Sequence, residues 1–191
     1  MKRLLLPALF ALILTGPVAA ATYEIDARHT QVQFTYTHLG FSHLSARLNE
    51  VTGSFDFDPA NPAKSAISVQ LPMASLSTGV PRLDTHLNSA DFFDAATFPT
   101  ASFKSNAVKV LGKDHLSVSG DLTIHGVTRP VVFDVTINGV GPHPMRKTPA
   151  MGLDASTTIK RSDFGVGGFA QAVADEVRLH ISLEASVPKP E

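Results

Sequence analysis

The feature that most constrains this chain is a repeated alternation of apolar and polar side chains with a period of two residues. It is clear between Leu116 and Ile124, where Val118 and Leu122 share one face and Ser117, Ser119 and Asp121 share the other. Successive side chains of a strand point to opposite faces, so this period predicts a strand with one buried and one wet face. The pattern recurs eight times, and we predict strands over residues 29–38, 46–57, 66–72, 100–111, 115–124, 129–140, 149–160 and 173–187.

The connections between these strands predict how they are arranged. Residues 112–114 and 125–128 are short links rich in turn-forming residues, and such links make neighbouring strands antiparallel. No helix long enough to cover a sheet is apparent, so closing the sheet on itself is the way to hide both its apolar face and its edges. We therefore predict an all-β fold, an eight-stranded antiparallel barrel. Such a barrel holds either its own side chains or one elongated apolar ligand, which favours a carrier over an enzyme.

Residues 81–99 interrupt the alternation. Pro81 suits the first turn of a helix, and Ser89 with Asp91 behind it suits a helix start. We predict one or two short helices here, inserted between the third and fourth strands and packed across one opening of the barrel. Residues 40–45 and the glycine-rich residues 165–168 are predicted to be loops or bends.

The N-terminus has the pattern of a secretory signal. Lys2 and Arg3 precede an apolar run from Leu4 to Leu14, and small residues end at Ala21. The apolar run is too short to span a bilayer, so we predict a signal peptide over residues 1–21, no stable membrane anchor, and a single domain over residues 22–191. The location expected from this is the periplasm.

Composition narrows the function further. The chain has no Cys, so neither a disulfide nor a thiolate site is available. Its 16 Lys and Arg nearly balance its 17 Asp and Glu, which gives no footprint for nucleic acid. Ser162 lacks the Gly-x-Ser-x-Gly context of a hydrolase nucleophile, and no catalytic residue is predicted.

Several short motifs, spread over nearly all of residues 22–187, carry a family resemblance. They are Ile25-Asp26-x-x-His29-Thr30-x-Val32-x-Phe34, His38-Leu39-Gly40, Gly53-x-Phe55, Asp84-x-His86-Leu87-x-Ser89-x-Asp91-Phe92-Phe93-Asp94, Phe98-Pro99, Phe103-x-Ser105, Gly120-x-Leu122-Thr123-Ile124-His125-Gly126-Val127-Thr128 and Arg161-x-Asp163-Phe164-Gly165. In order and spacing they resemble the YceI-like family of secreted lipid-binding proteins. The family usually has a basic residue directly before the Asp of the helical motif, whereas here Leu83 stands there and Arg82 lies one position earlier.

The resemblance implies a lipocalin-like barrel around a long polyisoprenoid, such as a quinone tail or a polyprenyl phosphate. It implies no cofactor beyond this non-covalent lipid. Burial of each CH₂ is worth ~0.8 kcal/mol, so a dry tube can hold a long prenyl chain with few polar contacts. A homodimer is a further expectation, because two-fold dimers are the commonest assembly.

The candidate binding residues are mainly aromatic. Five Phe residues on the apolar sides of strands are predicted to point inward, and Phe92, Phe93 and Phe98 with Leu87 are predicted to form a hydrophobic lid. The full candidate set for the cavity and its mouth is Phe34, Tyr36, His38, Phe41, Phe55, Phe57, Arg82, Asp84, His86, Leu87, Phe92, Phe93, Phe103, Phe133, Arg161 and Phe164. The alternative, in which these aromatics simply fill a solid core, stays open at this point.

The polar candidates also allow more than one interpretation. Arg82, Asp84, Arg161 and Asp163 either form ion pairs that fasten the helix to the end of the seventh strand, or leave the two arginines for an anionic headgroup. His38, His86 and His125 either bond to loop backbone or gather at the mouth as a metalloenzyme site. A third functional possibility is an interaction module for a membrane redox or quinone-processing partner.

Overall fold

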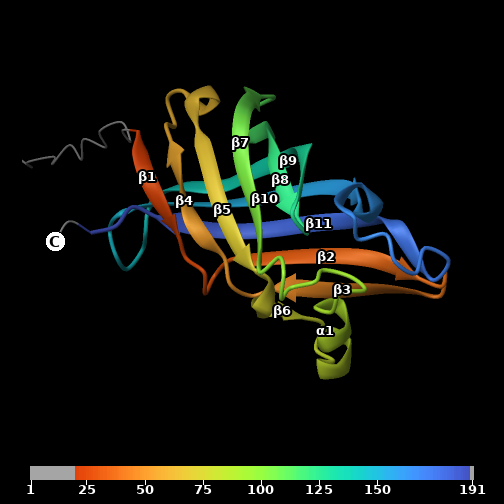
Figure 1. Ribbon diagram of the computed structural model, residues 1–191. Coiled ribbons are helices and arrows are strands. Elements are labelled where there is room, and N and C mark those ends of the chain that lie inside the picture. The colour runs from red at the N-terminus through yellow and green to blue at the C-terminus, as the bar shows by residue number, and fades with distance from the viewer. Residues whose placement is uncertain (1–19, 190–191) are drawn as a thin grey trace, which may run out of the picture.

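The structure is a computed structural model that describes residues 20–189 (Figure 1). Most of the predicted signal peptide therefore lies outside the described residues. Ala21 begins the first strand of the fold. Among the described residues, no helix has the length and apolar character needed to cross a membrane.

The described chain is built mostly from strands. The strands are β1 (Ala21–Ile25), β2 (Gln31–His38), β3 (Ser42–Leu48), β4 (Thr52–Phe57), β5 (Ala66–Pro72), β6 (Leu76–Ser77), β7 (Thr100–Val110), β8 (His115–Ile124), β9 (Val127–Pro142), β10 (Pro149–Lys160) and β11 (Val173–Ser186). One α-helix, α1 (Pro81–Leu87), and three short 3₁₀ turns, η1 (Pro62–Lys64), η2 (Met73–Ser75) and η3 (Arg161–Phe164), complete the elements.

The strands close into an eight-stranded antiparallel barrel, as predicted. The closed ring runs β1-β4-β5-β7-β8-β9-β10-β11 and returns through pairing of β11 with β1. Strand β11 is long enough to pair with β1 near its end and with β2 over the rest of its length. Strands β2 and β3 then pair with each other, and β3 pairs with the short β6. The β2–β3 hairpin thus extends the barrel wall beyond the ring (Figure 1).

The predicted strand over residues 46–57 is wrong in its boundaries. The chain forms two strands there, β3 and β4, separated by residues 49–51, and β3 begins at Ser42 within the predicted loop 40–45. The chain before β3 is divided in the same way. Strand β1, which lies outside the predicted strands, is separated from β2 by residues 26–30. Strand β1 pairs with β4 inside the closed ring, and β2 pairs with β3 in the hairpin that extends it. The two breaks therefore divide the chain between the ring and the hairpin.

The insertion between the third and fourth predicted strands contains one short helix, whereas one or two were predicted. Pro81 is the first residue of α1, as expected, but residues 89–97 form turns rather than a second helix. In those turns the Ser89 carbonyl accepts hydrogen bonds from the backbone N–H of Phe92 and of Asp94.

The turn between β8 and β9 consists of two residues in the left-handed region. His125 has φ 52° and Gly126 has φ 72°, the conformation of a type I′ hairpin turn. Phe98 packs over this turn, with its ring centroid 4.5 Å from that of His125. Phe98 thus covers the hairpin and is absent from the lining of the barrel cavities, contrary to its predicted role in the lid.

Candidate functional site

The interior of the barrel holds two adjacent apolar cavities. The first has a volume of about 370 Å³ and the second of about 150 Å³. The first is large enough for a small-molecule ligand, and apolar cavities as small as the second stay dry. They share a wall formed by Val32, Leu71, Leu122 and Leu179. The interior is therefore not filled by its own aromatic side chains.

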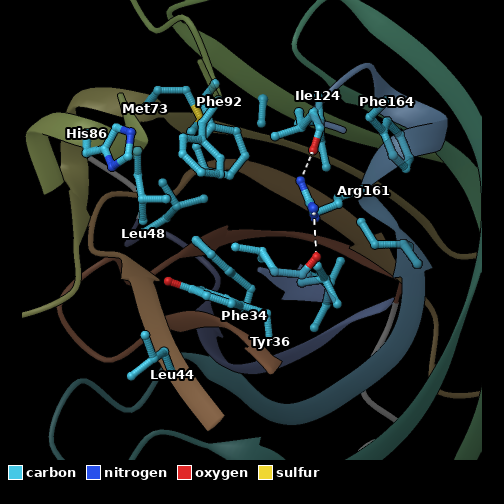
Figure 2. A pocket seen from close by; sticks show the side chains of 18 of the residues that line it. Phe34, Tyr36, Leu44, Leu48, Met73, His86, Phe92, Ile124, Arg161 and Phe164 are labelled. Carbon is cyan, nitrogen blue, oxygen red and sulfur yellow. Dashed lines mark hydrogen bonds between the residues drawn. The ribbon is translucent and has the colours of Figure 1, made fainter. Parts of the chain in front are cut away.

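Strand β2 supplies one side of the first cavity. Its residues Val32, Phe34, Tyr36 and His38 alternate along the strand, so all four point to the same face and line the cavity. Figure 2 shows Phe34 and Tyr36 in this wall. Phe34 and Tyr36 are buried, with ring centroids 6.3 Å apart. The two-residue period read from the sequence therefore predicts this wall.

Helix α1 and the turns behind it form the lid of the first cavity. Leu83, His86 and Leu87 line the cavity from one face of the helix, as residues three and four apart do. Phe92 and Phe93 line it from the following turns.

Arg82 and Asp84, predicted at the mouth, do not line the cavity. Arg82 is exposed on α1. The Asp84 carboxylate instead accepts two 2.6 Å hydrogen bonds, one from the backbone N–H and one from the hydroxyl of Thr78. Asp84 thus ties the start of α1 to the preceding loop.

Arg161 is the one buried cation of the first cavity wall within the described chain. Its Nη1 donates to the carbonyl oxygens of Val166 and Gly168 at 2.5 and 2.6 Å. Its Nη2 donates to Val173 at 2.8 Å and its Nε donates to Ala174 at 3.0 Å. Figure 2 shows the guanidinium held between two carbonyl oxygens at the cavity edge. The arginine thus orders the loop between η3 and β11.

The ion pairs predicted among Arg82, Asp84, Arg161 and Asp163 are not formed in the described chain. Arg161 bonds to backbone carbonyls instead. Burial lowers the pKa of the guanidinium, and nearby Asp175 opposes that shift. Asp175 itself accepts hydrogen bonds from the backbone and hydroxyl of Ser162, which lower the pKa of its carboxyl. A guanidinium has five N–H groups, so one Nη2–H has no acceptor among residues 20–189.

The polar groups that line the first cavity are neutral or cationic. They are Tyr36, His38, His86 and Arg161, and no Asp or Glu of residues 20–189 lines this cavity. Burial raises the pKa of Tyr36, so its hydroxyl stays protonated and can donate. The His86 ring packs edge-on against Phe92 and Phe169, with centroids 5.0 and 5.7 Å away. This set favours a ligand group that accepts hydrogen bonds or carries negative charge.

The second cavity lies deeper in the ring and is lined by the remaining aromatic residues that were predicted to point inward. Phe55, Phe57, Phe103 and Phe133 line it. Phe103 and Phe133 meet edge to face, with ring centroids 5.1 Å apart. Beyond it, fully buried Tyr23 stacks on Phe55 at 5.3 Å.

Thirteen of the sixteen candidate residues therefore line one of the two cavities, including Phe164 in the first. Arg82 and Asp84 do not, and Phe41 points into solvent on the turn between β2 and β3. Ligand binding by the thirteen stays a prediction.

Sequence reasoning missed several residues of the first cavity. Met73, Val166 and Phe169 line it from η2 and from the loop between η3 and β11. These segments have no strand or helix period, so the sequence carried no signal of where their side chains point. The glycine-rich stretch over residues 165–168 marked the loop but not its contact with the cavity.

The three histidines proposed as a metal site are not brought together. His38 and His86 line the first cavity, whereas His125 forms the β8–β9 turn against Phe98. No group of three metal-ligating side chains is found within residues 20–189.

Comparison with known proteins agrees with this architecture. Residues 23–185 match the model of the YceI-like domain. A UPF0312 protein of Pseudomonas putida (strain W619) is 42% identical over 176 residues, which cover 91% of each chain.

Solved structures show the same fold. BcnA of Burkholderia cenocepacia is 28% identical and superposes with a TM-score of 0.77, covering 85% of this chain and 99% of its own. A polyisoprenoid binding domain from Saccharophagus degradans, implicated in plant cell wall breakdown, is 16% identical, with a TM-score of 0.67 over 87% of this chain and 98% of its own. The sequence match and the barrel agree, and the chain belongs to the YceI-like family.

Proposed function

We propose that this protein binds a long-chain isoprenoid lipid non-covalently inside the barrel and does not transform it chemically. The observation that carries this proposal is the pair of adjoining apolar cavities, which share one wall of four aliphatic residues. An elongated ligand that moves this wall apart reaches from one cavity into the other.

The placement of polar groups gives the ligand a direction. The apolar tail occupies the second cavity, whose wall is almost entirely aliphatic and aromatic. The polar end remains in the first cavity near Tyr36, His86 and Arg161. Each buried CH₂ contributes ~0.8 kcal/mol, so the tail supplies most of the affinity and the polar end sets the orientation. The free Nη2–H of Arg161 suits a phosphate or a quinone oxygen.

The comparisons support the ligand class. The Saccharophagus degradans domain that shares this fold is a polyisoprenoid binding domain. The N-terminal pattern of residues 1–21 supports export, and we place the protein in the periplasm, where it sequesters or transports its lipid.

The test is to identify what the protein carries. Full-length protein, expressed with its own N-terminus and purified without detergent, is extracted with organic solvent and analysed by mass spectrometry. We expect a long prenyl compound in stoichiometric amount. A folded protein that yields no long apolar molecule contradicts the proposal.

A matched pair of variants locates the ligand. Phe34→Glu places a charge in the first cavity, and we expect it to abolish loading because an unpaired buried carboxylate is strongly disfavoured. Gln33→Glu adds the same charge to the preceding residue of β2, whose side chain points to the opposite face, and this variant should load normally. Equal loading of both folded variants would rule out the first cavity as the site.

A further inference from the structure

Two segments meet at the end of the molecule that lies opposite the start of β1 and the end of β11. They are the turn between β2 and β3 and the loop between η3 and β11, shown together at the right of Figure 1. The backbone N–H of Leu39 donates to the Ala172 carbonyl at 2.7 Å, and His38 lies opposite Val173 in the strand register. We call this end the rim, defined as residues 37–45 together with residues 164–173.

The rim exposes large apolar side chains beside the first cavity. Phe41 is 92% exposed, Leu39 is 55% exposed and Phe169 is 53% exposed. Phe169 also lines the first cavity, where its ring stacks on Phe92 at 5.4 Å. Phe169 is therefore both exposed at the rim and part of the apolar lining of the cavity.

The rim is also nearly free of charge. Residues 31–46 and 164–174 contain no Asp, Glu, Lys or Arg, although such residues make up 17% of the chain. Burying a charge without a partner is costly, and these residues include none of the four side-chain types that are charged throughout the neutral pH range. Large aromatic side chains on an uncharged edge suit the interfacial region of a bilayer better than a polar protein surface.

We infer that the rim docks on a lipid bilayer surface and holds the first cavity against the membrane, so that an apolar ligand passes without crossing water. This inference rests on the proposed function for its purpose, because only a lipid cargo needs such a path. The docking itself depends on the rim alone, and binding to vesicles is measured in a different assay from the lipid content of the barrel.

The absence of Trp from this chain makes a clean reporter available. Phe41→Trp places one indole on the rim, and the full exported protein is mixed with vesicles of phosphatidylcholine or of phosphatidylethanolamine with phosphatidylglycerol. We expect a blue shift of the emission with both compositions, and quenching by brominated phosphatidylcholine. Because the rim contains no Asp, Glu, Lys or Arg, raising the salt concentration should leave the shift unchanged.

Met145→Trp is the matched control. Met145 is 84% exposed in the loop between β9 and β10, and the neighbouring Arg146 contacts Asp26 at the opposite end of the barrel. Its emission should not shift with vesicles. No shift at Phe41→Trp, an equal shift at Met145→Trp, or a shift lost in salt overturns the inference and leaves a protein partner as the occupant of the rim.

A second variant separates docking from loading. Leu39 and Phe41 do not line either cavity, so the double variant Leu39→Ser with Phe41→Ser should retain its lipid in the mass-spectrometric assay. We expect its partitioning onto vesicles to fall about tenfold or more, given the burial energy of two large apolar side chains. Unchanged partitioning overturns the docking, whereas a protein that docks but carries no lipid overturns only the proposed function.

Discussion

The Asp26 carboxylate accepts a 2.8 Å hydrogen bond from Nη2 of Arg146, a residue 120 positions further along the chain. Asp26 lies in the loop between β1 and β2, and Arg146 lies in the loop between β9 and β10. Nη1 of Arg146 also donates to the Ser186 hydroxyl of β11 at 3.1 Å. One guanidinium thus ties three segments together at the end of the barrel opposite the rim.

This contact predicts a pH-dependent contribution to stability. The Arg146 hydrogen bond, helped by His29, lowers the pKa of Asp26 from 3.8 to about 2. A carboxyl whose pKa is lower in the folded state stabilises the fold above its unfolded pKa, and this stability is lost as the pH falls from about 4 towards 2. Asp26→Asn should therefore lower the free energy of unfolding at pH 7 by about 1–2 kcal/mol. In urea denaturation, the free energies of unfolding of the wild type and of Asp26→Asn should converge as the pH falls below 4.

Arg28→Gln is the control for this network. The Arg28 side chain is 83% exposed and lies 3.8 Å from the same carboxylate, so its removal should change stability by less than about 0.5 kcal/mol. A loss equal to that of Asp26→Asn would mean that Arg146 is not the dominant partner.

Leu122 separates the two cavities, and its size should set the length of ligand that fits. The side chain is buried in β8 and lines both cavities. Leu122→Ala should shift the bound lipids to longer or bulkier chains while destabilising the fold by about 2–5 kcal/mol. Leu122→Phe should shift them to shorter chains or lower the occupancy. Mass spectrometry of the extracts measures both, and the exposed neighbour substitution Asp121→Ala should leave the distribution unchanged.

Two glycines in the left-handed region separate backbone strain from a steric clash. Gly126 has φ 72°, and a Cβ there would lie 2.5 Å from the Phe98 ring; Gly79 has φ 79° with open space around it. Gly79→Ala should cost about 1–2 kcal/mol for the conformation alone. Gly126→Ala should cost about 1–3 kcal/mol more, because Phe98 must move. Thermal denaturation measures both, and Phe98→Ala should recover the excess in the Gly126→Ala background; no recovery would exclude the clash as its cause.

Arg161 should prove necessary for the order of the cavity edge. Arg161→Lys keeps the charge but replaces four hydrogen bonds spread over three nitrogens by those of a single ammonium. We expect the free energy of unfolding to fall by about 2–3 kcal/mol and hydrogen exchange to rise over residues 164–174. Arg178→Lys, on the exposed face of β11, should change neither.

Local pattern was enough to predict most of the strands and the faces they present, but not β1, β6 or the break between β3 and β4. Phe34 and Tyr36 lie two residues apart in β2 and both line the first cavity, and Phe103 and Phe133 line the second. The period of a strand fixes its inward set, because neighbouring side chains point to opposite faces. The short turn at His125 and Gly126 likewise fixed the antiparallel pairing of β8 with β9.

The site depended on contacts that no local pattern encodes. Helix α1 is too short for its period to show which side faces the barrel, and packing turned Leu83 inward and left Arg82 exposed. The partners of Arg161 are carbonyl oxygens of residues 166–174, which any sequence of side chains presents alike.

By itself, then, the sequence determined the type of sheet, its antiparallel order and the apolar character of its interior. Only the tertiary structure decided that the interior is hollow, that β1–β2 and β3–β4 break where they do, and that Phe41 points away from the cavity into solvent. The physical reason is that alternation acts between neighbours along one strand. A cavity, by contrast, is the space left after side chains from the whole ring have packed, and their combined volume is set by pairings between distant segments.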